Sequence, residues 1–296
     1  MSALETLSKA SDKSVLFVGE TIIDVYHYVS PLGRPLKESI VSVQLCNTER
    51  FLGGVVAAAE HAKEFCARVD LHSTGHATVK ERWVEASHVR KLFEVYSQEA
   101  ESFDAPLRPL LEAINYDAVI VTDYGHGMMN GILDDLRPAN FLAVNVQTNS
   151  GNFGFNLATK YEWLRPNYLV VDEPEARLAT QNRDGPITAS LDELRERVAE
   201  KVIITLGKQG AIGQDATGTY SASAFTDKVV DTIGAGDAFF AITALIAEDT
   251  DMPTLLEIGN AAGAIKTGIV GHRGRVTKDA LTRQLEVRGS GITGTG

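Results

Sequence analysis

The sequence predicts an α/β protein whose mainly parallel central sheet is covered by helices on both faces. Helical patterns alternate along the chain with short apolar runs, and this alternation is typical of parallel sheets with buried strands. The apolar runs occupy 15–20, 116–125, 141–147, 168–173 and 201–207. Polar residues or glycines also stand at or just past strand ends, where open parallel sheets bind ligands. These residues are Asp24, Asp123, Asn145, Asp172 and Gly207.

The N-terminal third combines one buried strand with segments of exposed β structure. In the run at 15–20 apolar residues stand together before a glycine, as in buried strands. Residues 26–51 contain prolines and a glycine and then alternate in polarity, which favours half-exposed strands. A diglycine opens a small-residue helix with an apolar stripe, and a short strand follows at 67–74. Residues 78–97 indicate further β structure.

Helices and strands alternate through the remainder of the chain. A helix is expected from Pro106 onward, ahead of the strand at 116–125. Residues 289–296 are rich in glycine and predict a flexible tail, so we expect one domain over residues 1–288. Further helices are predicted at 173–179, 190–201, 238–248, 255–269 and 278–287.

Composition limits the classes of function. The 296 residues include 44% apolar and 23% charged residues, which is ordinary for a soluble globular protein. A net charge of −11 without a dense basic run argues against nucleic acid as the main partner. The two cysteines, Cys46 and Cys66, favour a reducing compartment. No signal peptide and no run of the roughly 20 apolar residues of a membrane span are present, so we expect a cytoplasmic enzyme.

The stretch DTIGAGD at 231–237 is the most specific local pattern, and an apolar helix follows it. Its glycines allow a tight turn, and a helix beginning there directs free N–H groups at an anion such as phosphate. The amides of Gly234, Ala235 and Gly236 would then neutralise a phosphoryl group. A carboxylate repels phosphate, so Asp237 makes sense as the base that takes a proton from an alcohol. The alternative is a glycine turn with an aspartate cap.

This stretch resembles the C-terminal signature of the ribokinase/phosphofructokinase-B family of carbohydrate kinases. The resemblance extends over roughly residues 14–282 and, within the family, is nearest to heptose-7-phosphate kinases and kinase modules joined to nucleotidyltransferases. It implies a ribokinase-like fold with a small β lid from about 26–50 and 78–97. It implies transfer of phosphate from ATP to a hydroxyl of a sugar or sugar phosphate, with Mg²⁺. A monovalent cation stays open as a further cofactor.

The resemblance also implies residues on the substrate side. Asp24 would bind sugar hydroxyls, and the backbone at Gly53 and Gly54 would approach the sugar. His126 and Asn145 lie in polar loops and are candidates for substrate contact. The alternatives are a solvated acid, a helix-start turn and loop-forming residues, respectively. Two lid residues, Lys80 and Arg82, could bind a substrate phosphate or form surface salt bridges instead.

A second set of residues is implied for the nucleotide and the metal. Asp172 and Glu175 resemble an element that holds Mg²⁺ through water, although acids are also favoured at a helix N-terminus. The turn at 205–210, where the run at 201–207 ends, resembles a nucleotide-binding turn. The corresponding residues are Thr205, Gly207 and Gly210, with Gly234 and Gly236 nearby in the motif and Asn260 beside the adenine.

Two departures from the family pattern leave alternatives open. Glu60 stands where the usual residue is Asn, and its carboxylate would repel a sugar phosphate unless it points away. Between 74 and 78 the chain lacks an expected helix-and-strand unit. The alternatives are therefore a kinase for a free sugar or nucleoside, or a catalytically degenerate nucleotide-binding protein. The alternating lid segments also predict a homodimer joined through the lid strands.

Overall fold

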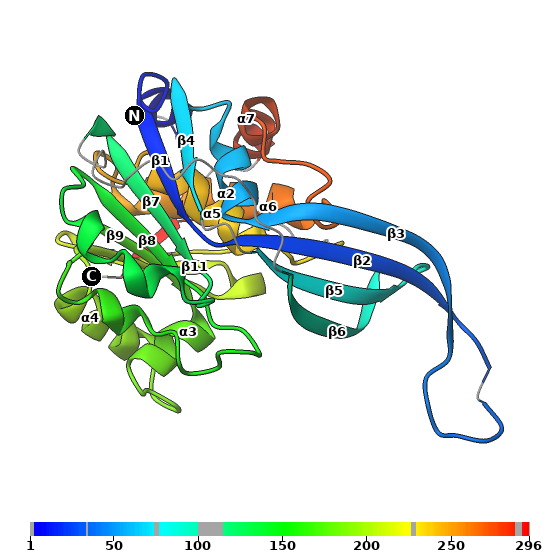
Figure 1. The fold of residues 1–296 in the computed structure, drawn as a ribbon. Helices are drawn as coiled ribbons and strands as arrows, with labels where there is room; N and C mark the ends of the chain where they lie inside the picture. Colours follow the sequence, from blue (N-terminus) through cyan, green and yellow to red (C-terminus); the bar gives the residue numbers. More distant parts are fainter. Residues whose placement is uncertain are drawn as a thin grey trace.

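The computed structural model describes residues 3–33, 35–73, 77–99, 115–225, 229–287 and 292–295. These residues form two sheets, a nine-stranded central sheet and a four-stranded lid (Figure 1). The predicted helix from Pro106 lies outside the described residues for most of its length. No helix in the described ranges is both long and apolar enough to cross a bilayer.

The central sheet has the strand order β13-β12-β11-β10-β9-β8-β7-β1-β4. The strands from β10 to β4 in this order are parallel, and β11, β12 and β13 extend the sheet at its other end as antiparallel strands. The parallel strands are β1 (Ser14–Gly19), β4 (Arg68–His72), β7 (Ala118–Asp123), β8 (Leu142–Val146), β9 (Tyr168–Asp172) and β10 (Lys201–Thr205). The antiparallel strands are β11 (Ala211–Asp215), β12 (Gly218–Ala222) and β13 (Ile292–Thr295).

Helices cover both faces of this sheet, as the sequence predicts. One face carries α1 (Ala3–Ser8), α2 (Val55–Ala62), α5 (Ala235–Ala244), α6 (Met252–Thr267) and α7 (Lys278–Val287). The other carries α3 (Glu173–Ala179), α4 (Ile187–Arg197) and 3₁₀ turns. Successive strand residues such as Phe17 and Val18 belong to the cores of opposite faces, which explains why the strands are continuously apolar.

The lid consists of β2 (Thr21–Pro31), β3 (Val43–Gly54), β5 (Ala77–Glu85) and β6 (Arg90–Glu99), in the order β3-β2-β5-β6. It projects to one side of the central sheet (Figure 1). Only Glu20 separates β1 from β2, so the chain passes directly from the central sheet into the lid. The lid therefore begins at Thr21, earlier than the predicted residue 26.

Three further differences from the sequence-based expectation have physical reasons. The hairpin β11–β12 was not predicted, because its short strands contain glycine and polar residues and lack a clear apolar alternation. Residues 292–295 were expected to be flexible but pair with β12, whose edge would otherwise leave backbone groups unpaired. The absent helix-and-strand unit is consistent with the structure, since β4 ends at His72 and β5 begins at Ala77.

Candidate active site

The predicted anion loop lies at the N-terminus of α5. Gly234 is the N-cap residue and has a φ of +76°, a left-handed conformation that favours glycine. A Cβ there would lie 3.1 Å from Cε of Lys266 and 3.3 Å from Cε1 of His272. Ala235 and Gly236 occupy the first two positions of the helix, where backbone N–H groups have no partner within the helix. The loop therefore has the geometry of an anion site.

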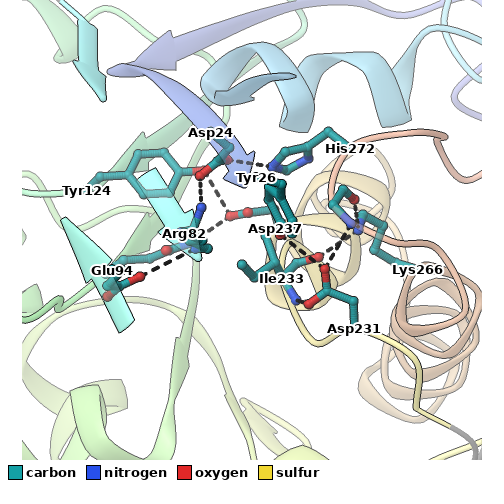
Figure 2. Close-up of polar contacts among 12 residues, drawn as sticks. Asp24, Tyr26, Arg82, Glu94, Tyr124, Asp231, Ile233, Asp237, Lys266 and His272 are labelled. Atoms are coloured by element: carbon teal, nitrogen blue, oxygen red, sulfur yellow. Dashed lines mark hydrogen bonds and ion pairs between the residues drawn. The ribbon is translucent and has the colours of Figure 1, made fainter. Parts of the chain in front are cut away.

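Asp237 is held by one oxygen and free at the other (Figure 2). Its Oδ1 accepts hydrogen bonds from the Tyr124 hydroxyl at 2.9 Å and from Nε2 of Gln147 at 2.6 Å. Its Oδ2 has no hydrogen-bond partner within the described part of the chain. The side chain is buried. A carboxylate oriented in this way can accept a proton through Oδ2.

Tyr124 and Gln147 are functional candidates that the sequence analysis did not identify. They follow β7 and β8, and their position just past strand ends is the signal that could have found them. Asn145 was predicted to contact substrate, but both of its polar groups are used inside the protein. Its Nδ2 donates to the carbonyl of Val170 at 2.9 Å, and its Oδ1 accepts from Gln147 at 2.9 Å. The contacts give Asn145 the role of positioning Gln147.

Asp24 lies in β2 of the lid, where its carboxylate contacts the side chains of Arg82 and His272. It forms an ion pair with Arg82, and its Oδ2 is 3.0 Å from Nε2 of His272 (Figure 2). A Cβ on Gly53 would collide with this carboxylate, and a Cβ on Gly54 would collide with the carbonyl of Glu20. The diglycine thus lets β3 pack closely against Asp24. His272 was not identified from the sequence, because it lies 248 residues from Asp24.

The contacts of Asp24 with Arg82 and His272 predict a pH dependence of stability. Burial alone would raise the pKa of Asp24, but His272 and Arg82 outweigh it and lower this pKa from 3.8 to about 2. The lower pKa in the folded state stabilises the protein above pH 3.8, and this contribution is lost as the pH falls toward 2. It amounts to about 2 kcal/mol at neutral pH.

Urea unfolding of the wild type and Asp24→Asn should therefore give a difference in unfolding free energy that shrinks by about 1 kcal/mol between about pH 6 and pH 3. Asp184→Asn, at an exposed pair with Arg183, is the control and should show no such trend. A difference for Asp24→Asn that stays constant over this range would contradict the assignment.

Lys80 carries a buried positive charge that no carboxylate among the described residues contacts directly, although the charges of Asp24, Glu94 and Asp237 act on it from further away. It lies beside Asp24 in the register of β5 and β2, on the same face of the lid. Among the described residues it forms neither an ion pair nor a hydrogen bond, and its ammonium lies 5.2 Å from the centre of the Tyr96 ring. Burial lowers the pKa of Lys80. Arg82, by contrast, is paired with Asp24 and Glu94.

His126, the other predicted substrate residue, is also close to this region. Its Nδ1 is buried and finds no hydrogen-bond partner among the residues that the structure describes. Burial and the nearby Lys80 charge lower the pKa of His126 to about 4, so the ring is neutral at physiological pH. An unsatisfied buried ring nitrogen is available to a ligand hydroxyl.

Asp172 and Glu175 form a capping box at the start of α3, which is the alternative that the sequence left open. Asp172 Oδ1 accepts from the Glu175 amide at 2.8 Å, and Glu175 Oε2 accepts from the Asp172 amide at 2.7 Å. Glu175 Oε1 accepts from the amide of Thr148 at 2.9 Å. Burial and the neighbouring Asp172 charge raise the pKa of Glu175. Mg²⁺ prefers such oxygen donors and would offset this repulsion, so the pair fits the ion chemically.

Two of the residues predicted for the nucleotide, Gly210 and Asn260, meet at the end of β12. Gly207, with a φ of +57°, has open space where a Cβ would be, whereas a Cβ on Gly210 would collide with the carbonyl of Ala222. Asn260 Nδ2 donates to the same carbonyl at 3.1 Å. Thr205 ends β10 and leads into this turn. The structure therefore brings the turn and α6 together, with Gly207 free to approach a ligand.

Glu60 does not carry the repulsion that the sequence suggested. It forms an ion pair with Lys63, and its Oε2 lies 3.2 Å from Nη1 of Arg275. These partners neutralise the carboxylate at the surface of α2. This departure from the family pattern therefore gives no reason against an anionic substrate.

Comparisons with known proteins show similarity to carbohydrate kinases over part of the chain. Residues 143–277 match the model of the pfkB family of carbohydrate kinases. A segment of 111 residues is 40% identical to the ATP-dependent ribose-1-phosphate kinase of Halopiger xanaduensis, covering 36% of this chain and 38% of that protein. A segment of 127 residues is 35% identical to 2-dehydro-3-deoxygalactonokinase of Haloferax volcanii, covering 42% and 39%. The chain thus spans about two fifths of the length of these relatives.

The fold comparison extends over nearly the whole chain. Ribokinase from Thermotoga maritima superposes with a TM-score of 0.69 at 15% identity, covering 93% of this chain and 99% of that one. The chain therefore has a ribokinase-like α/β fold.

Proposed function

We propose that this chain, whose residues 143–277 match the pfkB family of carbohydrate kinases, is an ATP-dependent kinase of an anionic sugar. The observation that carries the proposal is the arrangement at α5. Asp237 presents a buried carboxylate oxygen that has no hydrogen-bond partner among the described residues, at the helix start where the amides of Gly234, Ala235 and Gly236 lie. Of these amides, that of Ala235 donates to the carbonyl of Thr232 at 3.3 Å. A base beside an anion site is the combination that phosphoryl transfer to an alcohol requires.

In the proposed reaction, Oδ2 of Asp237 takes the proton of a sugar hydroxyl. The hydroxyl oxygen forms a bond to the γ-phosphorus of ATP, and the bond from that phosphorus to the β,γ-bridging oxygen breaks. ADP leaves with the electron pair. The loop amides stabilise the charge on the transferred group. Tyr124 and Gln147 hold the base, and Glu175 with Asp172 would hold Mg²⁺ through water, where the ion would neutralise phosphate charge.

The buried charge of Lys80 supports an anionic substrate. Burying an unpaired ammonium is costly, and a substrate phosphate or carboxylate at the lid would remove that cost. The two relatives are named for a sugar phosphate and a sugar acid. Heptose 7-phosphate is the first candidate from the sequence resemblance. Asp24, which is the register partner of Lys80, and His126, on whose ring the Lys80 charge acts, would bind its hydroxyls.

The test is ATP consumption by the purified chain against paired phosphorylated and free sugars, sugar acids and nucleosides, with the product identified by ³¹P NMR. We expect turnover with an anionic sugar. Preference for a free sugar or a nucleoside would replace the substrate class and keep the reaction. ATP binding without turnover on any substrate would favour the degenerate nucleotide-binding protein.

A homodimer through the lid is a further part of the proposal. The lid exposes large apolar side chains around residues 32–45 and on β6, and such patches are typical of interaction surfaces. β3 and β6 also present the two edges of the lid sheet. The exposed side chains include Leu36, Ile40, Val41, Leu45 and Phe93.

Light scattering at micromolar concentration should therefore give twice the mass of the chain. Leu45→Lys should shift the population toward monomer, because a buried charge at an interface is unfavourable. The control is Val287→Lys, a more exposed apolar site at the end of α7, which should leave the mass unchanged. Monomer alone for the wild type would contradict the dimer.

A further inference from the structure

Lys266 places a buried ammonium group directly behind the anion loop. It belongs to the last turn of α6, and no part of the residue is exposed. Its Nζ donates to the carbonyl of Ile233 at 2.6 Å and to the carbonyl of Gly271 at 2.7 Å (Figure 2). Its Cε would lie 3.1 Å from a Cβ on Gly234. The ammonium thus ties the segment before α5 to the segment after α6.

Asp231 completes this arrangement from the other side of the same two residues. Its Oδ1 accepts from the amide of Ile233 at 3.2 Å, and its Oδ2 accepts from the amide of Gly271 at 2.9 Å. The carbonyls of Ile233 and Gly271 therefore both accept from Lys266, and the amides of the same two residues both donate to Asp231. Tyr26 and Lys91 bind the remaining positions of this carboxylate at 3.1 and 2.9 Å. The first residue of the DTIGAGD stretch is therefore part of a closed network around the loop.

The family resemblance left open whether a monovalent cation binds this chain as a further cofactor. The positions of these two carbonyls answer to the same ligand chemistry as such a cation. Backbone carbonyl oxygens from separate segments are typical ligands of K⁺. Beside the anion loop, the carbonyls of Ile233 and Gly271 converge in this way, next to the Asp231 carboxylate, and the ammonium of Lys266 already binds them. The residues around the loop therefore do not fit a separate cation.

We propose that the Lys266 ammonium takes the place of a monovalent cation behind residues 231–236, so that ATP binding by this chain requires neither K⁺ nor Na⁺. A tethered ammonium supplies the same unit of positive charge to the same carbonyl oxygens. It also holds the left-handed turn at Gly234 that orients the loop amides. The inference concerns a positioning residue and rests on the proposed function where it invokes ATP.

The first experiment uses the wild-type chain in a buffer whose only monovalent cation is tetramethylammonium. Calorimetry with MgATP and thermal unfolding are each repeated with K⁺ added at the same ionic strength. We expect the Kd for MgATP to agree within about twofold and the Tm to be unchanged. A Kd that tightens tenfold or more in K⁺ would overturn the inference. Absence of ATP binding in both buffers would overturn the proposed function instead, and the Tm comparison would then still decide the inference: a Tm raised by K⁺ alone overturns it.

The second experiment compares Lys266→Ala with Lys201→Ala. Lys201 is the matched control, because its ammonium also donates to backbone carbonyls, those of Ala247, Glu248 and Thr250 at 2.6–3.3 Å. It begins β10, at the end of the sheet away from the anion loop. A purely structural role would lower the Tm of both variants without a specific response to K⁺.

We expect Lys266→Ala to weaken MgATP binding at least tenfold in tetramethylammonium, and K⁺ or NH₄⁺ to restore part of the affinity. Lys201→Ala should bind MgATP like the wild type in either buffer. Unchanged affinity of Lys266→Ala in tetramethylammonium would overturn the inference. If Lys266→Ala does not fold, the wild-type comparison decides the question alone.

Discussion

Replacing Asp237 with asparagine should lower kcat by about 10²–10⁴-fold, the usual cost of losing a positioned base, while the Kd for ATP stays within about threefold. Asparagine keeps an Oδ1 that can accept from Tyr124 and Gln147, but an amide nitrogen replaces the free Oδ2. The variant therefore loses proton acceptance and retains the shape of the site. Steady-state kinetics and calorimetry on the same preparation measure the two quantities.

Asp251→Asn is the matched control for this variant. Asp251 is also an aspartate at a helix N-terminus, where it accepts from the amide of Thr254 at 2.9 Å. Asparagine caps helices about as well as aspartate, so this change removes one charge without removing a base. We expect its kcat to match the wild type. Near-normal turnover of Asp237→Asn would show that another group accepts the proton.

Replacing Lys80 with methionine should lower kcat/KM for an anionic sugar by about 10–10²-fold and change that for its neutral counterpart by less than about threefold. A hydrogen bond to a charged group typically contributes about 1.5–3 kcal/mol, and each factor of ten corresponds to about 1.4 kcal/mol. Methionine preserves the length of the buried side chain against Tyr96 and removes only the charge. The measurement is kcat/KM for each member of a phosphorylated and free sugar pair.

Lys37→Met controls for the change in net charge, because Lys37 is exposed in the segment that joins β2 to β3. It should leave both kcat/KM values within about twofold. If Lys80→Met lowers the two values equally, the ammonium does not contact the substrate anion, and its role is to support the lid. If neither value changes, the substrate anion binds elsewhere.

Much of the fold could be predicted from local sequence. Each apolar run became a strand because a parallel strand buried on both faces must be apolar throughout. Residues 173–179 form a helix as predicted, since an aspartate, a proline and a glutamate at its start cap it locally. The hairpin β11–β12 and strand β13 were not predicted, because their stability comes from pairing with neighbouring strands and little of it is encoded in their own composition.

The candidate active site also combines features that the local sequence predicts with features that depend on tertiary contacts. The DTIGAGD stretch determined by itself the left-handed turn, the helix start and the carboxylate three residues beyond the turn, because these depend on neighbouring residues along the chain. Only the tertiary structure decided which oxygen of Asp237 is free, that Arg82 is paired while Lys80 is not, and that His272 and Lys266 reach Asp24 and the anion loop. Those contacts join residues far apart in the sequence, and the energy of a buried charge depends on what the fold places around it.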